Sequence, residues 1–218
     1  MRIKRTPMFR RLLASLFAGV VRFCSMPSRG TERLPLDRHG QSVVRVDWRV
    51  CAVLVAAVAA IYTRTLYNGF VEFDDPSYLW NNPTISGGIT YASVKAAFFS
   101  ASAANWHPVT WLSHMTDWQL FGRNAGGHHA TSLLLHAINA VLLYVALLRL
   151  TRDRLASAAC ALLFAVHPLR VESVAWVSSR KDLLSGLFFF LTLIAYHRYT
   201  KRQTVGRYTL ALAMFALG

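Results

Sequence analysis

The sequence predicts an all-α, polytopic membrane protein, and three observations support this class. Of the 218 residues, 54% are hydrophobic, and the mean hydropathy is +0.33. The apolar residues are concentrated in blocks, some of which approach the roughly 20 residues that a helix needs to cross a bilayer. The segments between blocks are rich in Arg and Lys, as cytoplasmic loops of membrane proteins are.

The first apolar block runs from Val50 to Tyr62 and reaches Phe70 if the Arg64 side chain extends toward the headgroups. The later blocks are Ala130 to Leu150, Leu155 to Leu169, Leu183 to Tyr196, and Tyr208 to Gly218. The last block stops without a helix cap or a polar flank. We therefore expect residues 47–218 to be the incomplete, front part of a longer multi-spanning domain.

Basic residues predict the orientation. If four blocks cross in turn, the basic segments all fall on one side, which the positive-inside rule makes cytoplasmic. These segments are the N-terminal extension 1–46, the turn with Arg149, Arg152 and Arg154, and the turn with Arg198, Lys201, Arg202 and Arg207. Residues 70–127 and 167–182 then face outward from the cytoplasmic membrane. Anionic lipid headgroups suffice to explain the net charge of +14, so we predict no nucleic-acid partner.

The two outward segments are expected to contain amphipathic helices at the membrane surface. In the first, "TYASVKAAFFSA" places Tyr91, Val94, Phe98 and Phe99 where they can share a helix face. In the second, residues 167–182 read as one interfacial helix. That helix would place Arg180 and Lys181 at the height of lipid phosphates.

A polar stripe is predicted on the second apolar block. His129, Ser132, His136 and Asn139 occur at i, i+3, i+7 and i+10 of one helix. Such side chains face a wet cavity or the interior of a helix bundle, or they bond neighbouring helices. The two histidines are too far apart on the helix to form a metal pair, so we predict no zinc site.

The acidic pair in "FDDPSYLWNNPTI" directly follows the first apolar block. Proline favours the first position of a helix, which makes Asp75, the residue before Pro76, a natural N-cap. Asp74 would then stay free and ionised near the positive end of the helix. The alternative is that both carboxylates merely cap and solvate the chain.

Four segments in this order resemble the membrane region of the tetratricopeptide-repeat O-mannosyltransferase family, and most closely its bacterial relatives. They are "FDDPSYLWNNPTI", "WHPVTWLSHMTDWQLFG", "GHHATSLLLHAINAVLLY" and "HPLRVESVAWVSSRKDLLSGL". The resemblance implies the N-terminal part of a C-superfamily glycosyltransferase fold. It also implies transfer of a mannose-like sugar from a polyprenyl-phosphate carrier to protein Ser or Thr hydroxyls. The acidic pair of such enzymes lies at the position of Asp74 and Asp75.

On this basis we expect an inverting displacement with Asp74 as the general base. Arg180 or Lys181 would contact the phosphate, with Arg64 as another candidate, and His107, Asp117 and His129 would contact sugar or acceptor. The scheme requires no cofactor, although a carboxylate pair could hold a metal ion. The fragment alone is expected to be inactive. The alternatives are a transporter and a membrane anchor for a peptide-binding repeat domain.

Overall fold

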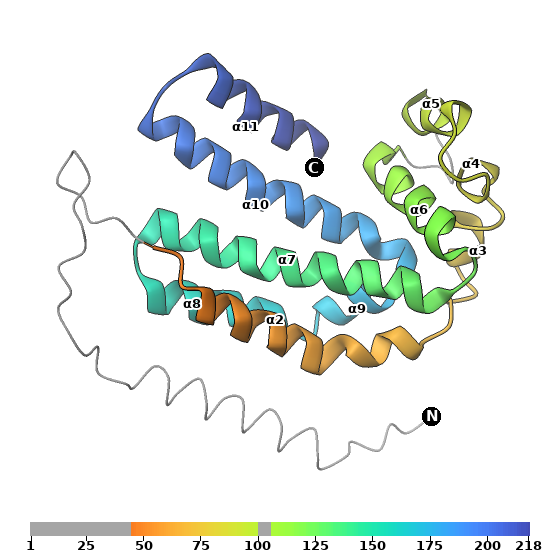
Figure 1. Ribbon diagram of the computed structural model, residues 1–218, viewed down its shortest axis with the longest axis horizontal. Coiled ribbons are helices and arrows are strands. Elements are labelled where there is room, and N and C mark those ends of the chain that lie inside the picture. The colour runs from red at the N-terminus through yellow and green to blue at the C-terminus, as the bar shows by residue number, and fades with distance from the viewer. Residues whose placement is uncertain (1–44, 100–105) are drawn as a thin grey trace, which may run out of the picture. The chain divides into compact units, whose positions relative to one another are not determined.

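The computed structural model describes residues 45–99 and 106–218, and every regular element in these two ranges is a helix (Figure 1). The predicted all-α class is therefore confirmed. Most of the predicted N-terminal extension, residues 1–46, lies outside the described residues. Within them, the first element is helix α2, Trp48–Tyr62, which continues into the 3-10 helix η1, Thr63–Tyr67.

Two of the described helices are long and apolar enough to cross a membrane. They are the continuous α2–η1 segment Trp48–Tyr67, with 20 residues, and α7, Ala125–Thr151, with 27 residues. Both match predicted blocks. Helices α8, Arg154–Val166, and α11, Val205–Leu217, are apolar but shorter. Helix α10 extends over Arg180–Lys201 and so begins before the predicted Leu183 and ends after the predicted Tyr196.

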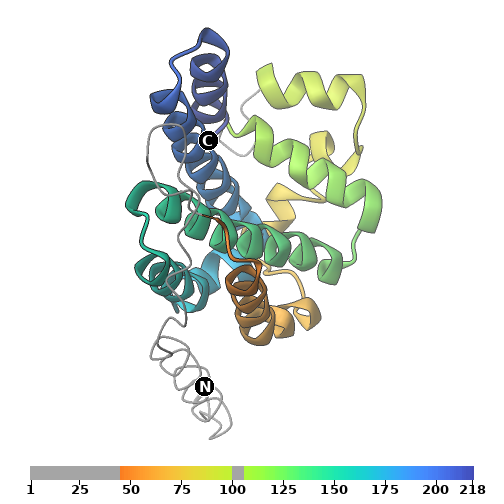
Figure 2. The same cartoon turned by 60° about the vertical axis from the view of Figure 1, so that its left-hand side comes forward.

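Helix α7 is the central helix, because it packs against α2, α8 and α10 (Figures 1 and 2). Its polar stripe faces these neighbours, and His129, Ser132, His136 and Asn139 are all buried. The His136 Nε2 atom lies 3.1 Å from the Ala165 carbonyl oxygen, and the Asn139 amide donates to the Leu183 carbonyl at 2.8 Å. At these two positions the stripe therefore bonds neighbouring helices, one of the two roles that the sequence left open.

The basic turns gather at one end of the bundle. The α7–α8 and α10–α11 turns lie toward the left of Figure 1, where α2 also begins. Asp47 caps α2 by accepting from the Arg49 N–H at 3.0 Å, and its carboxylate pairs with Arg154 at 3.2 Å. Arg207 donates to the Arg198 carbonyl at 2.9 Å. This arrangement is the one that alternate crossing of the blocks predicts.

The first predicted outward segment, residues 70–127, folds into short helices around their own apolar core. The helices are α3, Asp75–Tyr78, α4, Pro83–Ser86, α5, Tyr91–Phe99, and α6, Pro108–Phe121. The core consists of Tyr78, Leu79, Ile85, Ala97, Trp111, Met115 and Val177. Because Val177 comes from the second outward segment, the two segments share one core.

The aromatic residues that are predicted to share a face of α5 lie on its exposed side. Tyr91 and Phe99 are 85% and 83% exposed, whereas Ser93 and Ala97 are buried. The reason is the hydrogen bonding of Ser93, whose hydroxyl donates to the Gly88 carbonyl at 2.7 Å and accepts from the Thr90 N–H at 2.8 Å. These bonds turn the small-residue face of the helix inward and leave the aromatic rings outside.

The second predicted outward segment, residues 167–182, does not form the single helix that its sequence predicts. It forms α9, Arg170–Ala175, then the 3-10 helix η2, Val177–Ser179, and then the start of α10. The break falls at Trp176, which has extended backbone angles, φ −111° and ψ 116°. Just after the break, the Ser178 N–H donates to the distant Asp75 carboxylate instead of to a carbonyl of its own helix. A long-range contact thus overrides the local helical pattern.

The close packing of η1 against α7 gives the first testable prediction. A Cβ added at Gly126 would lie 2.8 Å from the Leu66 carbonyl oxygen, so Gly126→Ala requires a shift of backbone. We expect a loss of roughly 1–3 kcal/mol in the free energy of unfolding. The matched control is Gly206→Ala in α11, where a Cβ meets no atom within 4 Å. Thermal unfolding in detergent should separate the two variants, and equal losses would contradict the packing.

Candidate active site

Asp75 joins the two outward segments through its carboxylate, which is fully buried. One oxygen accepts from the Val71 N–H at 2.8 Å. The other accepts from the Ser178 N–H at 3.1 Å and from the Ser178 hydroxyl. The prediction that Asp75 caps the helix after it is therefore wrong. Its carboxylate is engaged, as expected, but it holds the start of α3 against η2.

Asp74 lies at the N-cap position of α3, but its side chain makes no capping hydrogen bond. Its carbonyl oxygen accepts from the Ser77 hydroxyl at 2.8 Å. Among the described residues, no hydrogen bond or ion pair involves the half-exposed Asp74 carboxylate. The acidic pair is thus divided as predicted into an engaged and an unpaired carboxylate, although for a different structural reason.

The start of α10 lies against α3. The Lys181 ammonium is 6.0 Å from the centre of the Tyr78 ring. Next to this contact, the rings of Phe73 and Trp176 are 6.4 Å apart. Together with the Asp75–Ser178 hydrogen bonds, these contacts bring the acidic pair and Lys181 to neighbouring elements although they are more than one hundred residues apart in sequence.

Arg180 and Asp117 form a buried ion pair, which differs from the placement that the sequence suggested. The distance from Nη1 of Arg180 to Oδ2 of Asp117 is 2.6 Å, and the two side chains are 0% and 4% exposed. The guanidinium also donates to the Ser113 hydroxyl at 3.2 Å and to the His128 carbonyl at 2.9 Å. The other oxygen of Asp117 accepts from the Thr131 hydroxyl at 2.8 Å. Arg180 is therefore a link between α6, α7 and α10, and not a cation at the surface.

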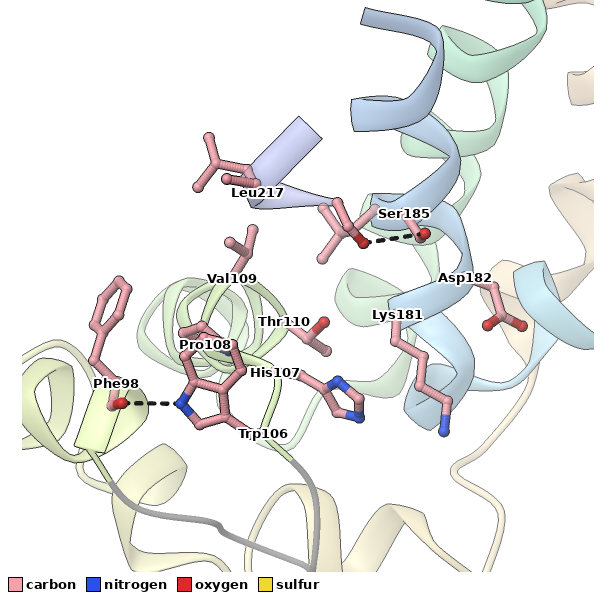
Figure 3. A pocket seen from close by; sticks show the side chains of 13 residues that line it. Phe98, Trp106, His107, Pro108, Val109, Thr110, Lys181, Asp182, Ser185 and Leu217 are labelled. Atoms are coloured by element: carbon pink, nitrogen blue, oxygen red, sulfur yellow. Dashed lines mark hydrogen bonds between the residues drawn. The ribbon is translucent and has the colours of Figure 1, made fainter. Parts of the chain in front are cut away.

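His107 and Lys181 line one pocket of about 390 Å³ (Figure 3). The pocket lies between the α5–α6 region and the start of α10, and its wall also includes Phe98, Trp106 and Ser185. The Trp106 indole donates to the Phe98 carbonyl at 2.9 Å. Partial burial lowers the pKa of His107, and the charge of Lys181 lowers it further, so the imidazole is neutral at pH 7. The pocket thus combines an aromatic wall with a neutral imidazole and an exposed ammonium.

The remaining predicted site residues lie apart from this pocket. His129 is buried in the first turns of α7, with its Nε2 atom 3.5 Å from the Gly69 carbonyl oxygen. Arg64 is exposed on η1. The predicted site residues therefore fall into four groups. Arg180 and Asp117 form a buried ion pair, and His107 and Lys181 line the pocket. Asp74 and Asp75 form the acidic pair, and His129 and Arg64 lie apart from the others.

His114 is a buried residue that the set of predicted site residues does not include. It lies on α6 next to the Arg180–Asp117 pair and is completely buried, and within residues 45–99 and 106–218 neither of its ring nitrogens has a hydrogen-bond partner. Burial holds its pKa well below the ordinary 6.5, and repulsion by Arg180 and then by His128 lowers the pKa further. The one signal in the sequence is the three-residue interval at which Trp111, His114 and Asp117 recur on one helix face.

This depressed pKa predicts a stability that depends on pH. Below about pH 6.5 the unfolded chain binds a proton at His114 that the folded protein excludes. The stability is therefore fully present above that pH, and it falls as the pH decreases toward the pKa of the folded state. We expect the unfolding temperature of His114→Leu to fall less than that of the wild type between pH 7 and pH 5. The same decrease in both proteins would contradict the assignment.

The chain is similar to several protein O-mannosyl-transferases. It is 30% identical to TMTC1 of Homo sapiens over 189 residues, which cover 81% of this chain and 21% of that protein. It is 30% identical to TMTC3 of Mus musculus over 165 residues, covering 72% of this chain and 17% of that protein. Tmtc1 of Drosophila melanogaster is 29% identical over 171 residues, or 74% of this chain and 20% of that protein. No family model and no solved structure matches the chain.

In the part of the chain that the structure describes, the protein is all-helical, with two helices long and apolar enough to cross a membrane. Within that class, the chain is a relative of the protein O-mannosyl-transferase family, as its sequence motifs suggest. It spans about a fifth of the length of the curated relatives that it matches.

Proposed function

We propose that the protein is a membrane glycosyltransferase that moves a mannose-like sugar from a polyprenyl-phosphate carrier to a hydroxyl of a Ser or Thr residue in a protein. The names of its relatives support sugar transfer to protein. Within the structure, the supporting observation is the Asp75–Ser178 contact, which brings an unpaired carboxylate and an exposed ammonium to neighbouring elements. The polyprenyl-phosphate carrier and the inversion of the anomeric configuration are parts of this proposal.

The reaction is a single displacement at the anomeric carbon. A hydroxyl is a weak nucleophile at neutral pH, so a positioned carboxylate that accepts its proton lowers the barrier. The hydroxyl oxygen forms the new bond to the anomeric carbon, and the bond from that carbon to the phosphate oxygen breaks with its electron pair. Attack and departure on opposite faces of the sugar invert the configuration of the anomeric carbon.

Three residues take the chemical roles in this proposal. Asp74 accepts the hydroxyl proton, because its carboxylate has no partner among the described residues. Lys181 stabilises the departing phosphate, because it is exposed at the pocket whereas Arg180 is committed to Asp117. His107 contacts the acceptor or the sugar from the other wall of the pocket. Asp75, Asp117 and Arg180 position these groups through the helices that they join, whereas Arg64 and His129 take no part.

The proposed location is the cytoplasmic membrane, crossed several times, with the N-terminus in the cytoplasm. The two candidate spans and the basic turns at one end of the bundle support this topology. It places α3–α6 and the start of α10 on the outer side, where protein acceptors emerge. The sugar carrier would then be presented by the same membrane.

The proposal is tested by glycan analysis of exported proteins from cells with and without the gene. We expect O-linked hexose on Ser or Thr of some exported proteins in the first strain and its loss in the second. Reintroducing the wild-type gene should restore the modification. Identical glycan profiles from the two strains would contradict the proposed function.

A further inference from the structure

A second cavity lies beside α10, and its lining residues have no role in the proposed reaction. Two neighbouring spaces of about 480 and 590 Å³ share Phe164, Arg170 and Asp182 in their walls, and together they are called the groove here. The groove lies between α7, α8, α9 and α10. It meets the His107–Lys181 pocket at Asp182 and Ser185, which line both.

One end of the groove is charged. His167, Glu172 and Ser173 line this end together with Arg170 and Asp182. The Arg170 guanidinium lies 4.5 Å from the centre of the Phe164 ring. In the described part of the chain no carboxylate forms an ion pair with Arg170. A half-buried guanidinium that stacks on a ring and lacks a counter-ion is suited to bind an anion.

The other end of the groove is apolar and lies along α7, one of the two candidate spans. Leu143, Leu183, Phe189 and Phe190 line it, and Gly186 packs against Asn139, where an added Cβ would lie 3.3 Å from the amide nitrogen. The Asn139 side chain is 1% exposed, and its carbonyl oxygen has no hydrogen-bond partner among the described residues although Asn139 lines the groove. The groove therefore offers an apolar trough, one unsatisfied buried acceptor and a mouth where the Arg170 guanidinium lies among the carboxylates of Glu172 and Asp182.

We infer that this groove binds the polyprenyl-phosphate sugar, with the isoprenoid chain along Leu143, Phe189 and Phe190 and the phosphate on Arg170. The inference rests on the proposed function for the identity of the lipid. Glu172 and Asp182 supply acceptors for sugar hydroxyls at the mouth, and Asp182 already accepts from the Ser173 hydroxyl at 3.3 Å. Arg170 thus contacts the phosphate from the groove, and Lys181 does so from the acceptor pocket.

The test is photo-crosslinking of the full-length protein in lipid nanodiscs with a polyprenyl phosphate that carries a benzophenone on its isoprenoid chain. We expect mass spectrometry to find the label on peptides from α7, α8 or α10 that line the groove. Unlabelled polyprenyl phosphate should compete at concentrations at least tenfold lower than phosphatidylglycerol. Equal competition by the two lipids would overturn the choice of occupant, and label found only elsewhere would overturn the groove.

Two variants with matched controls sharpen the test. Gly186→Leu adds a large side chain to the wall of the groove, where it meets Asn139, and Arg170→Gln removes the guanidinium; each should reduce labelling roughly tenfold. The controls are Gly206→Leu, where a Cβ meets open space, and Arg202→Gln at the opposite end of α10. Neither control should reduce labelling, and unfolding temperatures show whether each variant is folded. Normal labelling of folded Gly186→Leu and Arg170→Gln would overturn the inference.

The readouts separate this inference from the proposed function. Specific labelling of the groove in a protein that transfers no sugar would support the lipid site and contradict the transferase. Sugar transfer by a protein that is labelled only outside the groove would contradict the lipid site and leave the transferase standing.

Discussion

Replacing Asp74 by Asn is expected to lower sugar transfer by about 10²–10⁴-fold, because the amide cannot accept the proton of the attacking hydroxyl. The unfolding temperature should not change, since the Asp74 side chain makes no hydrogen bond within the described residues. The measurement is transfer from a radiolabelled polyprenyl-phosphate sugar to a Ser- and Thr-containing peptide by the purified full-length protein.

Asp75 and Glu72 are the controls for this prediction. Asp75→Asn disturbs the carboxylate that bonds Val71 and Ser178, so we expect it to lower both transfer and the unfolding temperature. Glu72 is an exposed neighbour in the same loop, and Glu72→Gln should change neither quantity. Full transfer by Asp74→Asn would remove the base assignment, and a large loss of stability in that variant would make the carboxylate structural.

The second large effect is expected at the buried ion pair. Replacing Arg180 by Met leaves the Asp117 carboxylate in the protein interior without its cation, which should cost roughly 3–5 kcal/mol of unfolding free energy. Asp117→Leu should cost a similar amount because it strands the guanidinium. The double variant should recover part of the loss, since no unpaired charge remains buried. Equilibrium unfolding in a denaturing detergent measures these differences.

A surface ion pair of the same chemistry provides the control. Arg154 pairs with Asp47 at 3.2 Å, but the Arg154 side chain is 52% exposed. Arg154→Met should therefore cost at most about 1 kcal/mol. If Arg154→Met and Arg180→Met had equal effects, burial would not be the cause of the expected loss at Arg180.

The features that local pattern determines were predictable from the sequence. The first and second apolar blocks form the two candidate spans, and His129 to Asn139 form a buried stripe, because a helix with a period of 3.6 residues places these side chains on one face. The kinship with protein O-mannosyl-transferases was visible in motifs that keep their order along the chain. That one member of the acidic pair is engaged was also predicted, but the reason drawn from the neighbouring proline was wrong, because Asp75 bonds Val71 and Ser178 and does not cap α3.

The contacts between distant segments could not be predicted. Ser178 lies 103 residues from Asp75, and no local signal indicates that its N–H leaves the helix to reach that carboxylate. The sequence around Arg180 is typical of an interfacial cation. Its burial depends on the ion pair with Asp117 of α6. The face of α5 is set by hydroxyl bonds of Ser93, which outweigh the aromatic pattern. In each case a specific polar bond decides between arrangements that hydrophobic periodicity leaves equal.

The most direct test of the central claim is the anomeric configuration of the product. The full-length protein would be given a polyprenyl-phosphate sugar of known configuration and a Ser- or Thr-containing peptide, and the linkage would be read by NMR spectroscopy. We expect a sugar on the hydroxyl oxygen with the configuration opposite to that of the donor. A product with retained configuration, or no product from folded protein that binds both substrates, would contradict it.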